Sequence, residues 1–181
     1  MGLAQDLDFK GKVSRQRKVR RLIMDTREPD EVSYTLLAGQ GYTVTRRTML
    51  VGDWGWDLRP ESFLSQRGYV EVLIERKTLA DLRDTERLIR QLKGAALLTA
   101  SRDWDRKVFF IVLIEHKFDT DRKRKWSEKA IQNAKLSLQL DQDVYVTECD
   151  ENGIASTIDS LYNWSSKAKH QLGGEIDNAD E

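Results

Sequence analysis

The sequence predicts an α/β protein: a three-layer α/β/α sandwich built around a mixed central sheet. Segments typical of strands alternate along the 181 residues with segments of helical periodicity. One of them, "KVFFIVLIEHK" at residues 107–117, is apolar on both faces, which indicates a central strand covered on both sides. With 39% hydrophobic and 33% charged residues, the chain has the composition and length of one globular domain.

The N-terminal elements are a strand and a helix. Residues 21–25 ("RLIMD") form a short apolar run that suits a buried strand. A proline followed by acids then starts a helix, because proline is favoured in the first turn and acids interact well with the N-terminal end of the helix dipole. This helix is expected through residues 31–40, ending at Gly39 or Gly41.

A hairpin is expected next. Residues 42–58 alternate and are rich in β-branched and aromatic side chains, so they predict one strand, bent at Gly52 or Gly55. Residues 59–68 are polar and predict a loop. Residues 69–77 ("YVEVLIERK") predict the next strand, which should pair with the previous one in antiparallel fashion.

Helices alternate with two strands in the rest of the chain, and one of these strands is the central one at residues 107–117. Residues 78–102 carry leucines and alanines near helical spacing and predict a long amphipathic helix, interrupted around residues 84–86. Residues 127–140 predict a helix, residues 143–149 a strand, and residues 154–172 a closing helix. The alternation of elements supports the sandwich.

The composition also bears on the compartment. A single cysteine, Cys149, allows no internal disulfide and favours a reducing environment. No apolar run approaches the ~18–20 residues of a membrane span, and the N-terminus lacks the apolar segment of a signal peptide. We therefore expect a protein of the cytoplasm or nucleus without a membrane partner.

Charge is segregated along the chain although the formal net charge is zero. Residues 1–20 predict a basic N-terminal arm, residues 21–170 the folded domain, and residues 171–181 an acidic tail; residues 121–126 form a second basic cluster. Such a distribution suits a basic face that binds phosphates, although two solvated charge runs are an equal alternative.

Acidic residues stand at the ends of three predicted strands. Asp25 ends the first, Asp53 lies at the glycine bend of the second, and Glu75 ends the third. Strand alternation places Glu75 and Lys77 on one face and Arg76 on the other. If the three strand ends meet, their carboxylates repel each other unless a cation lies among them. Oxygen ligands of this charge suit Mg²⁺ or Mn²⁺ rather than zinc.

Carboxylates, a divalent cation and a lysine are what phosphodiester hydrolysis requires. The chain has an aspartate and, later, a strand on which one residue separates an acid from a lysine. This pattern resembles the motif of the PD-(D/E)xK nucleases. The longer pattern, Gly52–Asp53, then Glu75-Arg76-Lys77, then Asp81, resembles the signature of the XPF family of structure-specific DNA endonucleases. The resemblance spans about residues 21–161 and implies a restriction-endonuclease-like core that cleaves branched, flapped or splayed DNA.

The resemblance extends to other segments and implies roles for their residues. "MDTRE" at residues 24–28 is similar to the first motif of the family, and "ERLIRQL" at residues 86–92 to its long helix. The implied catalytic residues are Asp25, Asp53, Glu75 and Lys77, with Mg²⁺ or Mn²⁺ on Asp53, Glu75 and Asp25. The implied substrate-binding residues are Arg76, Arg27, Arg87 and Gln91, and the supporting residues are Glu28, Glu115 and Asp81.

Several alternatives stay open at this stage. Asp25 and Glu28 have a second interpretation as helix-capping acids, and Asp81 as an acid in the first turn of a helix. Trp54 and Trp56 share a face and suit either packing or stacking on DNA bases. The closing helix suits either pairing of two nuclease domains, as a homodimer or heterodimer, or simple coverage of the sheet. For the whole chain, the alternatives to the endonuclease are a non-catalytic scaffold partner and a Holliday junction resolvase or exonuclease of the PD-(D/E)xK type.

Overall fold

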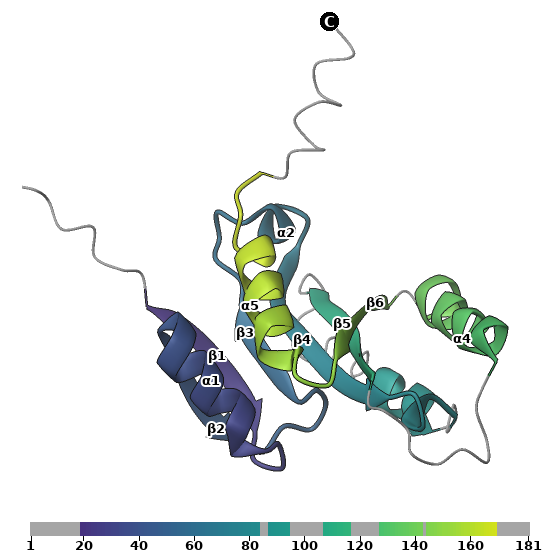
Figure 1. Cartoon of the computed structure of the whole chain (residues 1–181). Coiled ribbons are helices and arrows are strands. Elements are labelled where there is room, and N and C mark those ends of the chain that lie inside the picture. Colours follow the sequence, from purple (N-terminus) through teal and green to yellow (C-terminus); the bar gives the residue numbers. More distant parts are fainter. Residues whose placement is uncertain (1–18, 84–86, 95–106, 117–126, 143, 170–181) are drawn as a thin grey trace, which may run out of the picture.

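A six-stranded mixed sheet runs through the molecule in the order β2-β1-β3-β4-β5-β6 (Figure 1). The computed structural model describes residues 19–83, 87–94, 107–116, 127–142 and 144–169. The strands are β1 (Arg20–Asp25), β2 (Tyr42–Arg47), β3 (Trp54–Asp57), β4 (Tyr69–Thr78), β5 (Lys107–His116) and β6 (Tyr145–Asp150). β3 is antiparallel to β1 and β4, and the other neighbours are parallel.

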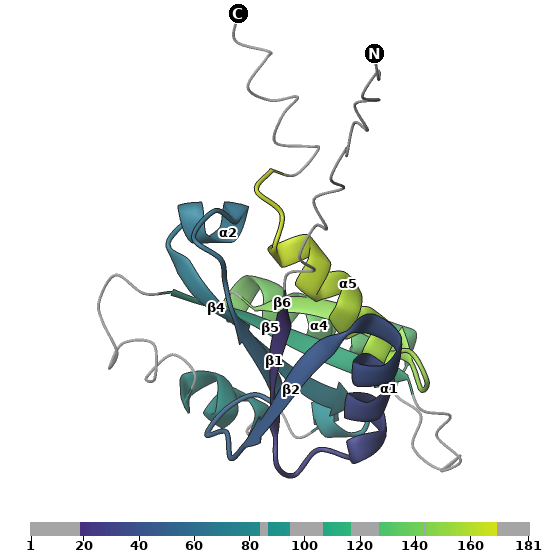
Figure 2. The ribbon, with the colours of Figure 1, turned by 90° about the vertical axis from the view of Figure 1, so that its left-hand side faces the viewer.

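Helices cover both faces of this sheet. They are α1 (Asp30–Gln40), α2 (Phe63–Gln66), a short 3₁₀ turn η1 (Asp81–Arg83), a helical segment at residues 87–94, α4 (Glu128–Asp141) and α5 (Ile154–Ser165). Side chains of α1 and α5 join one buried cluster, and those of residues 87–94 and α4 join another. Figure 2 shows α1 and α5 together along one side of the sheet. The three-layer α/β/α prediction is confirmed.

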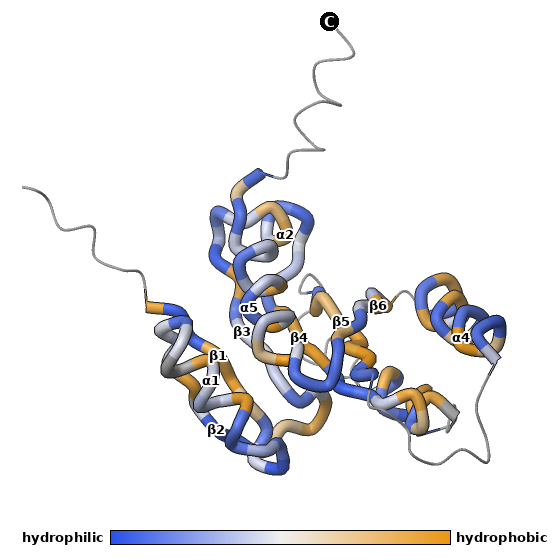
Figure 3. The backbone as a smooth tube through the Cα atoms, viewed as in Figure 1, coloured by the Kyte–Doolittle hydropathy of each residue, from blue (hydrophilic) through white to orange (hydrophobic). Residues whose placement is uncertain are grey.

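The sheet supplies both apolar cores through strand alternation. Hydrophobic residues run along β1, β4 and β5 (Figure 3). In β5, Phe109, Ile111 and Leu113 face the α1–α5 side, while Phe110 and Val112 face the other. The prediction of a central strand covered on both sides is therefore confirmed. None of the described helices combines the length and hydropathy needed to cross a membrane.

The prediction of one bent strand over residues 42–58 is wrong. The segment forms two strands, because the chain leaves the sheet after Arg47 and returns at Trp54. β2 pairs only with β1 and lies at the edge, whereas β3 lies between β1 and β4. Gly52, at φ +84°, adopts a left-handed conformation in the intervening loop that side-chain-bearing residues rarely take. Local alternation does not show which of two strands a segment pairs with.

Other boundaries follow the sequence closely. α1 ends where Gly41 takes a left-handed conformation at φ +69°, which confirms one of the two expected stops. β3 and β4 form the expected antiparallel pair. α2 interrupts the predicted loop, because Ser62 caps its N-terminus by accepting a hydrogen bond from the Ser65 backbone N–H at 3.2 Å.

The two ends of the chain and part of the predicted long helix lie outside the described residues. The basic arm up to residue 18, the basic cluster at residues 121–126 and the acidic tail therefore stay predictions. In the described part of residues 78–102, the 3₁₀ turn Asp81–Arg83 precedes the helical segment at residues 87–94. The predicted interruption at residues 84–86 lies outside the described residues and stays a prediction. The closing helix ends earlier than expected, at Ser165.

The tryptophans of β3 are packing residues. Trp54 and Trp56 are both buried, and the Trp56 indole N–H donates to Ser165 Oγ at 3.0 Å. α5 covers this face of the sheet through Ile158, which is fully buried, and Tyr162, whose ring lies 5.3 Å from that of Trp56. Both tryptophans are therefore inaccessible for stacking on DNA bases.

Candidate active site

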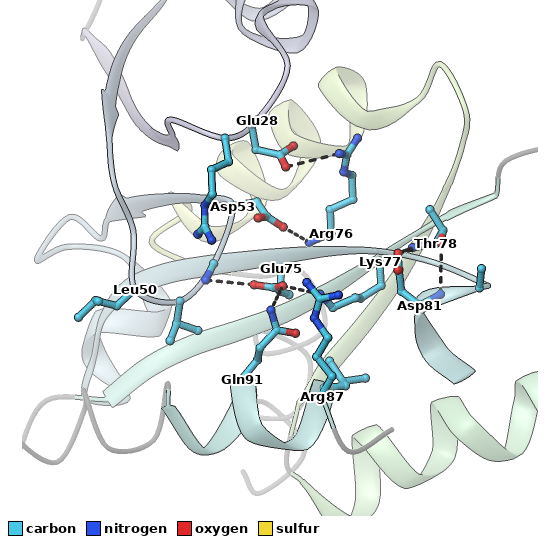
Figure 4. Close-up of a pocket in the computed structure, with 15 residues that line it drawn as sticks. Glu28, Leu50, Asp53, Glu75, Arg76, Lys77, Thr78, Asp81, Arg87 and Gln91 are labelled. Carbon is cyan, nitrogen blue, oxygen red and sulfur yellow. Dashed lines mark hydrogen bonds and ion pairs between the residues drawn. The ribbon is translucent and has the colours of Figure 1, made fainter. Parts of the chain in front are cut away.

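A cavity of about 370 Å³ opens where β4 ends, between the loop after β2 and the helical segment at residues 87–94 (Figure 4). Almost all of the charged residues singled out in the sequence lie around it. Its charged lining residues are Arg27, Glu28, Asp53, Glu75, Arg76, Lys77, Asp81 and Arg87. A cavity of this size and charge is suited to bind a polar, phosphate-bearing group.

Strand β4 delivers an acid and a lysine to the same face. Glu75 and Lys77 are both buried, and Lys77 Nζ donates to Glu75 Oε1 at 2.5 Å. Val72 and Ile74 pack into the core on the opposite face and hold the strand in place. The prediction that Glu75 and Lys77 share one face of the strand is therefore confirmed.

Two further donors orient the Glu75 carboxylate. Gln91, from the helical segment, donates through Nε2 to Glu75 Oε1 at 2.9 Å. The Gly52 backbone N–H donates to Oε2 at 3.1 Å. With Lys77, three donors from three parts of the chain hold one buried carboxylate, which lowers the energetic cost of its burial and fixes its direction.

Hydrogen bonds of its main chain hold Asp53 beside the Glu75 carboxylate. Its N–H donates to the Ile74 carbonyl at 2.7 Å, and its carbonyl accepts the Asp25 N–H at 2.8 Å, so its backbone bridges β4 and β1. Asp53 Oδ2 accepts the Arg76 backbone N–H at 2.7 Å. Burial, and next the negative charge of Glu75, raise the pKa of Asp53 to about 7.

Arg76 lies on the other face of β4, as predicted, and is bound by acids there. Its guanidinium lies 3.4 Å from Glu28 Oε1 and 3.6 Å from Glu115 Oε2, and 5.9 Å from the ring centre of Trp54. Burial raises the pKa of Glu28, and the charge of Arg76 acts against this rise. Arg76 therefore ties the start of α1 and the end of β5 to the strand that carries the site.

Asp25 does not join the other two carboxylates. It is fully buried and forms a two-pronged ion pair with Arg27: Oδ1 accepts from Nε at 2.8 Å and Oδ2 from Nη2 at 3.0 Å. This hydrogen-bonded arginine holds the pKa of Asp25 well below its usual range. Among the described residues, no group of three acids, histidines or cysteines is placed to share an ion. A direct catalytic or metal-binding role of Asp25 stays a prediction.

Arg27 and Arg87 lie exposed at the edges of the cavity. Asp81 closes the site beyond β4, where its Oδ2 accepts from the Thr78 N–H at 2.9 Å and the Thr78 hydroxyl at 2.8 Å. Burial acts to raise the pKa of Asp81, but the bonds from Thr78 outweigh it and the pKa is lowered. Asp81 thus shapes the turn after β4, in agreement with its structural interpretation.

Comparison with known families accounts for this arrangement. The family model of the ERCC4 domain matches residues 24–163, which is most of the chain. The chain belongs to the ERCC4-domain family. The match contains every residue of the candidate site, and the resemblance to the XPF family of nucleases is confirmed.

Solved structures share the fold of this ERCC4 domain. XPF from Aeropyrum pernix has 22% sequence identity and a TM-score of 0.55 over 81% of this chain and 62% of that chain. A second structure, XPF from Aeropyrum pernix in complex with DNA, has 24% identity and a TM-score of 0.54, over 81% of this chain and 64% of that chain. The chain thus spans less than two thirds of these proteins. A comparison with curated proteins found no match.

One component of the site was missed in the sequence. The backbone N–H of Gly52 contacts Glu75, and the loop over residues 48–53 is fixed by bonds to both sides. In the sequence, Gly52 was interpreted as a possible bend of a strand and as part of a motif. Its left-handed φ explains why glycine suits this position, but only the tertiary structure shows its N–H as a donor to Glu75.

Proposed function

We propose that this ERCC4 domain is a metal-dependent endonuclease that hydrolyses phosphodiester bonds in branched, flapped or splayed DNA. The observation that carries the proposal is that the half-buried Asp53 and the buried Glu75 and Lys77 lie together at one cavity. These two carboxylates repel each other, and a lysine lies beside them. Such a group has no evident structural purpose, because apolar side chains would stabilise a core strand better.

The donor set fits a divalent cation. The pKa of Asp53 is raised to about 7 by burial and by Glu75, so a positive charge between the two would stabilise both in the ionised form. Both donors are carboxylate oxygens, which suit Mg²⁺ or Mn²⁺. Bound by Asp53 and Glu75, such an ion would neutralise charge on the phosphate and make a water molecule a better nucleophile.

The remaining groups have roles that follow from their positions. Lys77, held by Glu75, is placed to donate to a phosphate oxygen or to the attacking water. Gln91 keeps Glu75 in its orientation and therefore acts on the reaction through that acid. Arg27 and Arg87 at the cavity edges supply positive charge for the neighbouring phosphates of the strand.

The substrate and the assembly are part of the proposal. That XPF from Aeropyrum pernix was solved in complex with DNA supports DNA as the ligand of the shared fold. We expect the chain to act as a homodimer or heterodimer through the nuclease domain. Light scattering of the purified chain tests this, because a homodimer has twice the mass of a single chain.

Cleavage of end-labelled DNA tests the activity. Splayed-arm, flap, four-way and linear substrates are incubated with wild type, Asp53→Asn and Lys77→Met in Mg²⁺, Mn²⁺ or EDTA. Defined internal cuts that need the metal and are lost in both variants support the proposal. Asp57→Asn and Lys107→Met, exposed residues of β3 and β5, are matched controls.

Four outcomes contradict the proposal in different ways. Binding of branched DNA without cleavage by wild type indicates the scaffold alternative. A ladder of products from the ends indicates an exonuclease, and symmetric cuts confined to four-way DNA indicate a resolvase. Cleavage by Asp53→Asn at the wild-type rate shows that the residues are assigned wrongly.

A further inference from the structure

Leu50 is the most exposed large hydrophobic side chain among the described residues, with 83% of its surface accessible. A single exposed leucine has no meaning by itself, since many occur on protein surfaces. Leu50, however, lies at the edge of the candidate active site, and Figure 4 shows it on the side of the cavity opposite Lys77 and Asp81. Leu50 contributes little to the core, so packing does not explain why a leucine lies at the edge of the cavity.

The chain just before Leu50 is anchored firmly. Met49 is buried, and its backbone N–H donates to Asp25 Oδ2 at 2.7 Å. Its carbonyl accepts from Arg27 Nη2 at 3.1 Å. The ion pair between the buried Asp25 and the exposed Arg27 therefore holds the main chain one residue before the exposed leucine.

The chain after Leu50 is anchored as well. The Gly52 N–H bonds to Glu75, and the Asp53 N–H bonds to the Ile74 carbonyl. The tip formed by Leu50 and Val51 is thus held from both ends by the same residues that build the active site. A side chain displayed in this way is preorganised, and little conformational entropy is lost when it contacts a ligand.

The surroundings indicate what an apolar tip would meet. Arg27 and Arg87, at the edges of the same cavity, suit the phosphates of a DNA strand. An aliphatic side chain among such groups cannot bind a phosphate, and its natural partner is the face of a base. Insertion of leucine between bases requires unstacking, which costs least where the stack is already open, as at a branch point.

We propose that Leu50 is a wedge that inserts beside the unstacked base pair at a DNA branch and thereby selects branched over continuous duplex. This inference rests on the proposed nuclease function and adds a specificity-determining residue to it. Asp53 follows Leu50 by three positions, a backbone span of at most about 11 Å. The wedge therefore also places the cut within a few nucleotides of the branch.

The first test compares cleavage by wild type, Leu50→Ala and Leu50→Met on a flap and on continuous duplex of the same sequence. We expect Leu50→Ala to lower the ratio of flap to duplex cleavage by about tenfold, the size of one lost stacking contact. Leu50→Met, which retains an apolar side chain, should keep most of the preference. Leu140→Ala removes an equally exposed leucine on α4 and is the matched control.

The second test detects the insertion without cleavage. Asp53→Asn is titrated onto a flap with 2-aminopurine at the branch, whose fluorescence rises when it unstacks. We expect a rise that is lost in Asp53→Asn/Leu50→Ala, although that double variant still binds the flap. Equal fluorescence of the two and an unchanged cleavage ratio overturn the wedge alone. Failure of wild type to bind any DNA overturns the wedge and the nuclease together.

Discussion

Replacing Asp53 with asparagine should stabilise the fold while abolishing the proposed activity. The asparagine side-chain oxygen retains an acceptor for the Arg76 N–H but removes a charge from beside Glu75. A pKa raised from its usual value of about 4 to about 7 corresponds to a free energy of about 4 kcal/mol. Because Asp53 keeps some contact with solvent, we expect a gain of roughly 2–4 kcal/mol in the free energy of unfolding above pH 7.

The pH dependence of this gain follows from the direction of the shift. Above pH 7 the carboxylate is ionised in both the folded and unfolded states, and the folded state is destabilised by the full amount. Below about pH 4 it is protonated in both states, and the difference disappears. The gain of Asp53→Asn should therefore shrink to less than half at pH 5.

Thermal unfolding in EDTA at pH 8 and pH 5 measures this effect. For a chain of this size, 1 kcal/mol shifts the melting temperature by about 2–4 °C, so we expect a rise of about 5–10 °C at pH 8. Asp57→Asn removes an exposed carboxylate from β3 and should change the melting temperature little. A variant no more stable than wild type at pH 8, or equally stabilised at both pH values, would refute the argument.

Three further outcomes follow from the same geometry. Arg76→Met should lower the free energy of unfolding by about 3 kcal/mol at pH 7 in a urea titration, because it leaves buried acids without their cation. The loss should be smaller at pH 5, since the raised pKa of Glu28 lets it take up a proton. Gln91→Leu, which frees Glu75 from one donor, should lower the cleavage rate by about tenfold with unchanged DNA affinity in a filter-binding assay. Millimolar Mg²⁺ should raise the melting temperature of wild type more than that of Asp53→Asn, because the proposed metal site would bind the ion in the folded state through this carboxylate.

Matched variants separate these effects from general damage. Arg90→Met and Gln139→Leu change exposed residues of the helical segment and of α4, and both should resemble wild type in stability and cleavage. A stable Arg76→Met at pH 7 would contradict the role of this arginine as the cation of the buried acids. Weaker DNA binding by Gln91→Leu would instead place Gln91 in contact with the substrate. If Mg²⁺ raised the melting temperatures of wild type and Asp53→Asn equally, Asp53 would be excluded as a ligand of the ion.

The sequence alone was sufficient for the local part of the site. Alternation along β4 places Glu75 and Lys77 on one face because successive side chains of any strand point to opposite sides. The spacing of Asp53, Glu75, Lys77 and Asp81 was enough to recognise the family, since that pattern depends only on chain order. The ends of α1 and the pairing of β3 with β4 were also predictable, because turn and capping signals are local.

Only the tertiary structure decided which of these groups act together. Asp25 was expected beside Asp53 and Glu75, yet it is paired with Arg27, because strand order and register set the direction of each strand end. The Gly52 N–H reaches Glu75 only because residues 48–53 leave the sheet between two strands. Leu50 lies exposed at the cavity for the same reason, since the anchors on either side of it come from two strands, β1 and β4, and from the loop after β1. Apart from the Asp25–Arg27 pair, these contacts join residues more than twenty positions apart in sequence, and no local pattern records them.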